Sequence, residues 1–377
     1  MRLLMIVISV LAIMTLNGAP KETIEKFNEN GVEIINNHIT PYKLKGLPSE
    51  VILKKEFSLD MENFEKEIGY IGCFNADSNG NLYLLDNQLY KILVLNNKGK
   101  FLKEMGSKGR GPGEFVAAMD IRINSLGEIV INDVLNRKFS VFSKEGELIK
   151  EVKFTFSSIG GIMLDNGNFI FNINKFPTSQ KENIKVISYL YNSKFKLIKE
   201  LYEIETLNPL AEKIIASYNN LCIDISSDKI FIGNQGLDYD IFVFDFSGKL
   251  LKKIRKKYTP ISPSPEFKKV FIERLGKKYK FFKSKLIFPE FLPPFHSFSS
   301  DKAGRLFVLT YEKDTITKSK YMLDIFNQEG VFIYRIGFEY PPFYRSILRT
   351  INDRLYFLYE QTTGSQKLIC YKIIWKK

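Results

Sequence analysis

The chain of 377 residues is poor in histidine and cysteine, and this narrows the kinds of site it can hold. The three cysteines, Cys73, Cys222 and Cys370, show no short spacing, so they match neither a disulfide framework nor a zinc motif. We expect free, buried cysteines in strands, with one long-range disulfide as the alternative in an exported protein. His38 and His296 cannot make a three-histidine metal site, although carboxylates can replace one histidine. We expect both to be structural.

Catalytic and cofactor motifs are also missing. The sequence has no Gly-x-Ser-x-Gly elbow and no Gly-Lys-Ser/Thr loop for phosphates. Asn79, Asn81 and Asp86 offer oxygen atoms, but they lack the spacing of an EF-hand calcium loop. We therefore expect no resident cofactor, with a structural or channel metal such as calcium as the alternative, and we favour a protein that is not an enzyme.

Long hydrophobic runs are absent except at the start of the chain. Arg2 precedes an apolar stretch from Leu3 to Leu16, and small residues follow at Gly18-Ala19. This pattern predicts a secretory signal peptide over residues 1–19, whereas a short membrane anchor would need a run nearer to ~20 residues. No cysteine lies near the expected cleavage region, which argues against a lipid anchor of the bacterial lipoprotein kind. We expect an exported protein, periplasmic or extracellular, without a transmembrane span after signal removal.

The clearest positive signal is a repeat. Three pairs of landmark residues are each 47 positions apart: Gly80 and Gly127, Asp86 and Asp133, and Gly99 and Gly146. Within one repeat, the segments 74–76, 82–85, 90–95 and 101–105 read as short strands separated by turns rich in Gly, Asn and Asp. The segment 106–113 after them holds too much Gly and Pro for a helix or a ladder. A period of this length with four strands predicts propeller blades.

The residues of this unit carry a family resemblance. The run Asp-x-x-Gly-Asn-x-Tyr-x-x-Asp from Asp77 to Asp86, and Gly-Ser-Lys-Gly-x-Gly-Pro-Gly-Glu-Phe from Gly106 to Phe115, resemble the NHL-type repeat of β-propellers. More narrowly, the chain resembles secreted six-bladed β-propeller proteins of bacteria, and the segment 288–294 with the turn 301–307 resembles them too. This resemblance implies a fold, and it implies little about activity because propellers host many functions.

The remaining copies follow the same rhythm and give six blades. The expected fold is all-β: a six-bladed β-propeller of four-stranded antiparallel blades over residues 48–377. The segment from Val51 to Leu59 supplies the outer strand that the last blade lacks. An N-terminal extension spans residues 20–47, with a short helix near Glu22 to Asn28. Further short helices are expected at Asn208–Tyr218 and in an insertion of about residues 263–284, where apolar residues recur at helical spacing.

The formal net charge is +13. Such an excess would favour nucleic acid in a cytosolic protein, but the export signal argues against that partner. Attraction to anionic surfaces or acidic polymers is the modest inference. We expect a protein or glycan of the cell envelope as partner, and the sequence leaves the oligomeric state open.

One end of the predicted ring carries the candidate ligand-binding residues. The turn between second and third strands and the connector after the fourth strand should meet there. This candidate set consists of Asp86, Asn87, Lys108, Arg110, Asp133, Asn136 and Arg137. The Gly-rich connector also offers backbone N–H groups to an anion, whereas Asp86 and Asp133 can equally cap their turns. We expect a binding scaffold that uses this loop face; a channel-mouth lyase or hydrolase using carboxylates or a metal is the alternative, and an assembly module is the third hypothesis.

Overall fold

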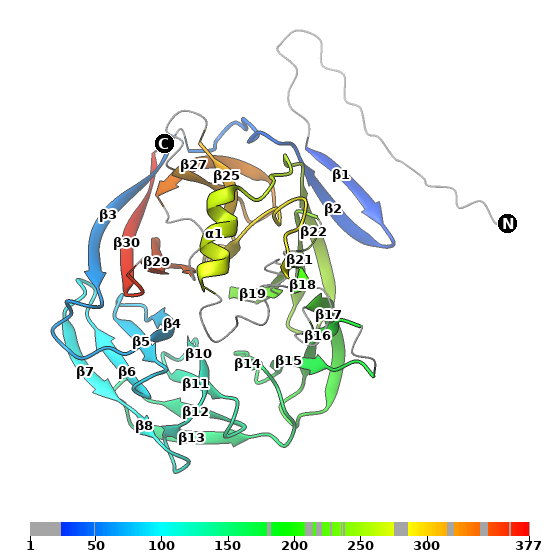
Figure 1. Ribbon diagram of the computed structural model, residues 1–377. Coiled ribbons are helices and arrows are strands. Elements are labelled where there is room, and N and C mark those ends of the chain that lie inside the picture. The colour runs from blue at the N-terminus through cyan, green and yellow to red at the C-terminus, as the bar shows by residue number, and fades with distance from the viewer. Residues whose placement is uncertain are drawn as a thin grey trace, which may run out of the picture.

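The computed structural model shows a closed ring of sheets (Figure 1). It describes residues 24–48, 50–178, 182–206, 208, 214–215, 221–226, 228–234, 236, 238–274, 286–314, 320–339, 346–361 and 363–376. The signal peptide expected at residues 1–19 lies outside the described residues.

Six four-stranded antiparallel units surround the ring axis, as the repeat predicts. The first blade comprises β4 (Ile71–Ala76), β5 (Leu82–Asp86), β6 (Lys91–Leu95) and β7 (Phe101–Met105). The second comprises β10 (Ala118–Ile123), β11 (Ile129–Asp133), β12 (Lys138–Phe142) and β13 (Leu148–Lys153). The third comprises β14 (Gly160–Met163), β15 (Phe169–Lys175), β16 (Ile184–Tyr191) and β17 (Leu197–Thr206).

The other three blades follow in chain order. The fourth comprises β19 (Leu221–Ser226), β20 (Lys229–Asn234), β21 (Asp240–Asp245) and β22 (Leu250–Lys256). The fifth comprises β24 (Ser297–Ser300), β25 (Leu306–Lys313), β26 (Lys320–Phe326) and β27 (Phe332–Glu339). The sixth comprises β28 (Ser346–Ile351), β29 (Arg354–Glu360), β30 (Gln366–Lys376) and, from the other end of the chain, β3 (Glu50–Asp60).

The ring closes in the sixth blade, which confirms the role predicted for the segment from Val51 to Leu59. Strand β3 pairs antiparallel with β30, from Glu50 opposite Lys376 to Asp60 opposite Lys367. Gln366 then ties this blade to the first: its Nε2 donates to the carbonyl of Ile71 (2.9 Å), and its Oε1 accepts from the Ile71 amide (2.7 Å). A strand that precedes the first blade in the chain and the last strand of the structure are thereby paired in one sheet, which closes the ring.

The N-terminal extension differs from the prediction. Instead of a helix near Glu22 to Asn28, the structure has a hairpin of β1 (Glu25–Glu29) and β2 (Val32–Asn37). Asn30 (φ 53°) and Gly31 (φ 85°) form its turn, as an Asn-Gly pair favours in a two-residue hairpin. Strand β2 pairs parallel with β22, so the fourth blade becomes a six-stranded sheet. The helix prediction was wrong because it overlooked this turn signal.

Two connectors also carry structure. In the Gly-rich segment 106–113, β8 (Ser107–Lys108) pairs parallel with β9 (Glu114–Phe115), which follows the segment, so the expectation of no ladder was wrong at Ser107 and Lys108. Helix α1 (Pro265–Arg274) confirms the start of the predicted insertion, and residues 275–285 lie outside the described part. Within the segment expected as a helix at Asn208–Tyr218, β18 (Ile214–Ile215) instead pairs with β23 (Leu286–Ile287); most of the other residues there are not described.

The core consists of apolar layers between neighbouring blades. Between the second and third blades, for example, Phe139, Phe154, Phe169 and Phe171 are buried together, and the rings of Phe154 and Phe171 lie 4.8 Å apart. Because each blade buries its faces against two neighbours, a long chain needs no single large core. In the described part of the chain, no helix has the length and apolar character of a membrane span.

Candidate functional site

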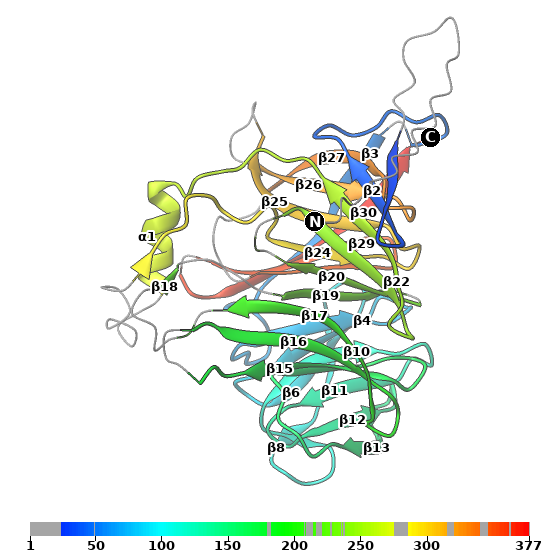
Figure 2. The ribbon, with the colours of Figure 1, turned by 90° about the vertical axis from the view of Figure 1, so that its right-hand side faces the viewer.

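The ring has two different ends. In an antiparallel meander, the turns between first and second strands lie at the opposite end from the connectors between blades. Helix α1 and β18 lie at the connector end, as the side view shows (Figure 2). The predicted candidate residues belong to this connector end as well.

The structure brings part of the candidate set together. The side chain of Asn136 donates to the carbonyl of Gly109 (3.0 Å), which joins the turn after β11 to the connector. Lys108 lies with its Nζ 4.7 Å from the ring centre of Tyr90, in the turn before β6. Arg137 donates to the carbonyl of Thr155 (3.3 Å), and Arg110 is exposed. Whether these residues bind a ligand stays a prediction.

The two aspartates of the set are buried and bonded from within. Asp86 accepts the backbone N–H groups of Gly69, Tyr70, Gln88 and Leu89 at 2.7–3.1 Å, and its side chain is fully buried. The backbone N–H of the neighbouring Asn87 donates to the carbonyl of Tyr70 (2.9 Å). Such carboxylates hold the blade entrance and its turn in place.

The Gly-rich connector is also satisfied internally. The amide of Gly111 donates to Glu114 (2.7 Å), and that of Gly113 donates to Glu151 (3.0 Å). Buried Lys138 pairs with Glu151 at 2.5 Å. Burial alone would raise the pKa of Glu151, but the bonds from Lys138 and Gly113 outweigh it and hold that pKa below its ordinary value. Glu114 and Glu151 thus accept the backbone N–H groups of Gly111 and Gly113, which an external anion would need as donors.

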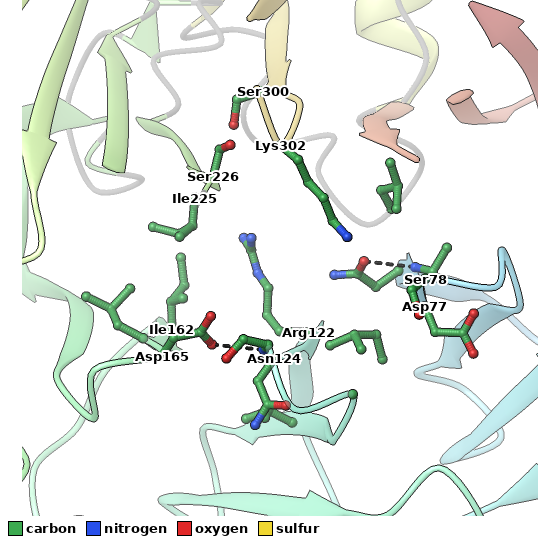
Figure 3. Close-up of a pocket in the computed structure, with 18 of the residues that line it drawn as sticks. Asp77, Ser78, Arg122, Asn124, Ile162, Asp165, Ile225, Ser226, Ser300 and Lys302 are labelled. Atoms are coloured by element: carbon green, nitrogen blue, oxygen red, sulfur yellow. Dashed lines mark hydrogen bonds between the residues drawn. The ribbon is translucent and has the colours of Figure 1, made fainter. Parts of the chain in front are cut away.

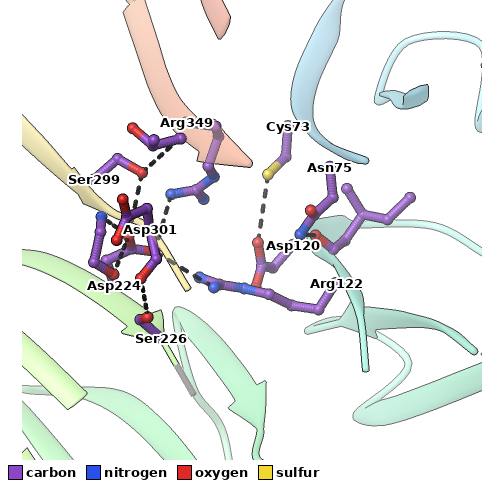
Figure 4. Close-up of polar contacts among 12 residues, drawn as sticks. Cys73, Asn75, Asp120, Arg122, Asp224, Ser226, Ser299, Asp301 and Arg349 are labelled. Atoms are coloured by element: carbon purple, nitrogen blue, oxygen red, sulfur yellow. Dashed lines mark hydrogen bonds and ion pairs between the residues drawn. The ribbon is translucent and has the colours of Figure 1, made fainter. Parts of the chain in front are cut away.

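The centre of the ring contains a polar network that the sequence did not reveal (Figure 4). It comes from the innermost strands β4, β10, β19, β24 and β28. Nε of Arg122 donates to Oδ2 of Asp120 (2.9 Å), two residues earlier on the same strand. Nη1 of Arg122 and Nη1 of Arg349 each lie 3.6 Å from Oδ1 of Asp224. Two arginines from different blades therefore face one carboxylate.

Asp224 is held firmly on its other side. Its Oδ2 accepts the Ser300 amide (2.6 Å) and hydroxyl (3.0 Å) and the Ser299 hydroxyl (3.3 Å). The Ser299 hydroxyl in turn accepts the amide of Thr350 (2.8 Å). Burial alone would lower the pKa of Arg122, but Asp120 and Asp224 more than offset it, so that pKa lies above its ordinary value. The network keeps Arg122 charged and joins the innermost strands of five blades.

A cavity of about 450 Å³ opens beside this network, at the end of the ring opposite α1. Residues from all six blades line it, among them Ser78, Arg122, Asp165, Ser226, Lys302 and Thr350. Arg122 rises near the centre of this channel-mouth pocket, between Ile225 and Lys302 (Figure 3). Asp165 accepts the Ser125 amide at 3.3 Å. The pocket combines the charged side chain of Arg122 with short polar side chains such as Ser78 and Ser226. A few fixed polar groups of this kind orient ligands in binding sites.

The cysteines and histidines do not come together in one site. All three cysteines are free. Cys73 lies 3.4 Å from Asp120 in the channel, and burial, followed by that carboxylate, raises the pKa of its thiol. The rings of His38 and Tyr42 are 5.1 Å apart, and those of His296 and Tyr311 are 5.8 Å apart. In the described part of the chain, no group of three His, Cys, Asp or Glu residues can hold a metal ion.

Sequence reasoning missed the channel residues because each blade contributes only one or two of them. Asp120 and Arg122 flank Ile121 on one strand, and Cys73 and Asn75 flank Phe74 on another. Polar residues alternating with apolar ones in the first strand of a repeat are the signal that could have indicated a polar channel.

Comparisons with known proteins agree with the fold. A family model described as a six-bladed β-propeller matches residues 65–221. A protein of Bacteroides fragilis described as exported superposes with a TM-score of 0.54 at 13% identity, covering 91% of this chain and 100% of that one. A DUF4221 family member from Bacteroides vulgatus gives 0.54 at 14% identity, covering 87% and 99%. The human E3 ubiquitin-protein ligase TRIM32 is 36% identical over 64 residues, which are 17% of this chain and only 10% of that protein's length. The chain is similar in fold to the two Bacteroides proteins, and its similarity to TRIM32 is confined to that short segment of sequence.

Proposed function

We propose that the protein is an exported binding scaffold whose ligand docks at the channel-mouth pocket. The observation that carries this proposal is that all six blades line one cavity of about 450 Å³. A site built by every blade is fixed by the closed ring, so its polar groups are held in place before a ligand arrives. Such preorganisation lowers the entropic cost of binding.

The choice of this end over the connector end rests on the state of the polar groups. At the connector end, Asp86 and the amides of Gly111 and Gly113 already bond to partners within the chain. At the mouth, Arg122 and Asp165 also have partners within the chain, but both line an open cavity, and Arg122 has more N–H donors than its bond to Asp120 uses. The mouth is therefore the better site for an external group, and we now favour it over the predicted loop face.

Export rests on the sequence pattern of residues 1–19 and fits a cell-envelope ligand, either a protein segment or a glycan. The network of paired carboxylates and arginines supports binding of a polar ligand, and the channel-mouth lyase or hydrolase stays the alternative.

Arrays of peptides and of envelope oligosaccharides, probed with the mature protein, test the proposal. Ser78→Trp should reduce binding by about tenfold or more, because the indole fills the pocket rim. Ser107→Trp is the matched control, since Ser107 is an equally exposed serine at the connector end. Chromatography of the recovered ligand separates the two functions: an unchanged ligand supports binding, and a cleaved ligand supports the enzyme. Loss of binding in the Ser107 variant alone would overturn the choice of site.

A further inference from the structure

The arginine pair of the channel has more donors than the channel has acceptors. Each guanidinium carries five N–H donors. Of the four oxygens of Asp120 and Asp224, Oδ2 of Asp224 is taken by Ser299 and Ser300, and Oδ1 of Asp120 faces the thiol of Cys73. Oδ1 of Asp224 is shared at 3.6 Å by both arginines, which is longer than a hydrogen bond. Acceptor oxygens are in short supply here.

Two buried polar atoms show the shortage directly. Nε of Arg349 is buried and has no hydrogen-bond partner among the described residues. The hydroxyl of Thr350, a residue only 5% exposed that lines the pocket, also lacks a partner in the described part. Native proteins rarely leave such atoms unpaired. An acceptor that enters the pocket can satisfy the hydroxyl of Thr350 and the N–H donors of Arg122 that its bond to Asp120 does not use, because both residues line the pocket.

The pocket wall supplies a second kind of contact. Ile123, Ile162, Ile225 and Ile351 come from four blades and line the cavity, and each is partly exposed. Burying an aliphatic group against them is favourable because it removes apolar surface from water. Phe246 is the one aromatic residue among the described lining residues, so a stacking platform for sugar rings is small.

We propose that the pocket captures the C-terminal carboxylate of a peptide whose last side chain is aliphatic. The carboxylate accepts charge-assisted hydrogen bonds from Arg122 and a hydrogen bond from the Thr350 hydroxyl, which both line the pocket, and the side chain packs on the isoleucines. Lys302, exposed at the rim, adds attraction for the incoming negative charge. This inference rests on the proposed function and names the ligand of that same pocket.

Isothermal titration of the mature protein with paired peptides tests it. Acetyl-Ala-Ala-Ile as the free acid should bind about 10- to 100-fold more tightly than the same peptide with a C-terminal amide, because the amide loses the charge. Acetyl-Ala-Ala-Gly as the free acid should bind more weakly than the isoleucine peptide. Trigalacturonate is the acidic-sugar arm, and binding of that sugar in preference to the peptide acid would overturn the peptide assignment.

Variants locate the carboxylate. Arg122→Gln should remove the preference for acid over amide, and Arg122→Lys should restore only part of it, since lysine lacks the planar fork. Arg255→Gln is the matched control: Arg255 pairs with Asp240 outside the channel at 2.9 and 3.1 Å. Thermal unfolding of each variant shows whether it is folded. If Arg122→Gln does not fold, the acid–amide comparison on the native protein still decides.

The outcomes separate this inference from the proposed function. Equal binding of acid and amide that Ser78→Trp abolishes would overturn the carboxylate and leave the pocket as a binding site. Array ligands that bind undiminished to Ser78→Trp would overturn the pocket itself. A peptide acid that binds in the millimolar range or tighter and loses its advantage over the amide in Arg122→Gln supports the inference.

Discussion

Asp86 and Asp133 lie 47 residues apart and make equivalent hydrogen bonds to the segment that enters the blade, in two successive blades. Asp86 accepts from the amides of Gly69 and Tyr70, and Asp133 accepts from those of Val116 and Ala117, which are 47 residues further along. Both carboxylates are at most 1% exposed. The repeat therefore conserves a buried carboxylate that holds the entrance of the blade, and the same residue type that marks the repeat in the sequence serves its architecture.

Replacement of Asp86 should reduce stability and leave the binding pocket intact. In Asp86→Ala, four backbone amides lose their acceptor, so the free energy of unfolding should fall by about 2–3 kcal/mol. Urea unfolding followed by circular dichroism measures the change. Asp86→Asn keeps one acceptor oxygen and should lose less. An Asp86→Ala protein of native stability that no longer binds its ligand would instead support Asp86 as a binding residue.

The N-terminal hairpin should depend on one buried side chain. Nδ2 of Asn37 donates to the carbonyls of Arg255 (2.9 Å) and Gly330 (3.0 Å), and its Oδ1 accepts the amide of Phe332 (2.7 Å). Asn37→Ala should lower the free energy of unfolding by about 1–3 kcal/mol, and the main effect should be more frequent local opening of β1 and β2. Hydrogen exchange by mass spectrometry should show faster exchange at residues 25–37 than in the native protein. Asn36→Ala is the control, because the Asn36 side chain bonds only to exposed Glu25 in the described structure. Unchanged exchange at residues 25–37 in Asn37→Ala would contradict the role of Asn37 in holding the hairpin.

Stability should fall at alkaline pH. The pKa of Tyr83 is raised from 10.0 to about 12 by burial and then by Asp77, and that of Tyr371 is raised to about 12 by burial and then by Glu339. The folded state keeps these protons where the unfolded chain loses them. Their contribution to the free energy of unfolding is thus complete below pH 10 and is lost as pH rises through about 12.

Urea unfolding across this alkaline range, together with the ultraviolet absorbance of tyrosinate, checks the prediction. Ionisation of the buried phenols should be delayed and should coincide with weakened stability. Tyr83→Phe should flatten part of the decline, since it removes one phenol. Normal tyrosine ionisation near pH 10 with constant stability would contradict the burial of these phenols.

Short sequence signals that repeat along the chain predicted the fold well. The residues of the candidate site are far apart in the sequence and were not predicted. The turns at Gly80 and Gly127, both with positive φ, repeat with the blade and indicate it from the sequence alone. The outer strand of the last blade was predictable because the count of strands left one place empty. The Asn30-Gly31 turn carried an equally local signal, and the polar composition around it hid the hairpin.

The channel residues depend on ring closure. Arg122 and Arg349 are 227 positions apart, and only the closed ring places both beside Asp224. No spacing rule within one repeat describes such a pair. The predicted residues from Lys108 to Arg137 could be found from the sequence because they fall within a single stretch of chain. For the same reason they belong to the connector and turn of one blade and not to the centre of the ring.

Covalent footprinting of the mature protein with and without its tightest array ligand tests the central claim most directly. Binding at the channel mouth predicts protection in the turns that line it, at residues 76–78, 122–125, 162–165, 300–302 and 350–352. Residues 107–111 and 133–137 at the opposite end should react equally in both samples. Protection confined to those two connector segments, with the mouth unchanged, would contradict the account and return the site to the predicted loop face.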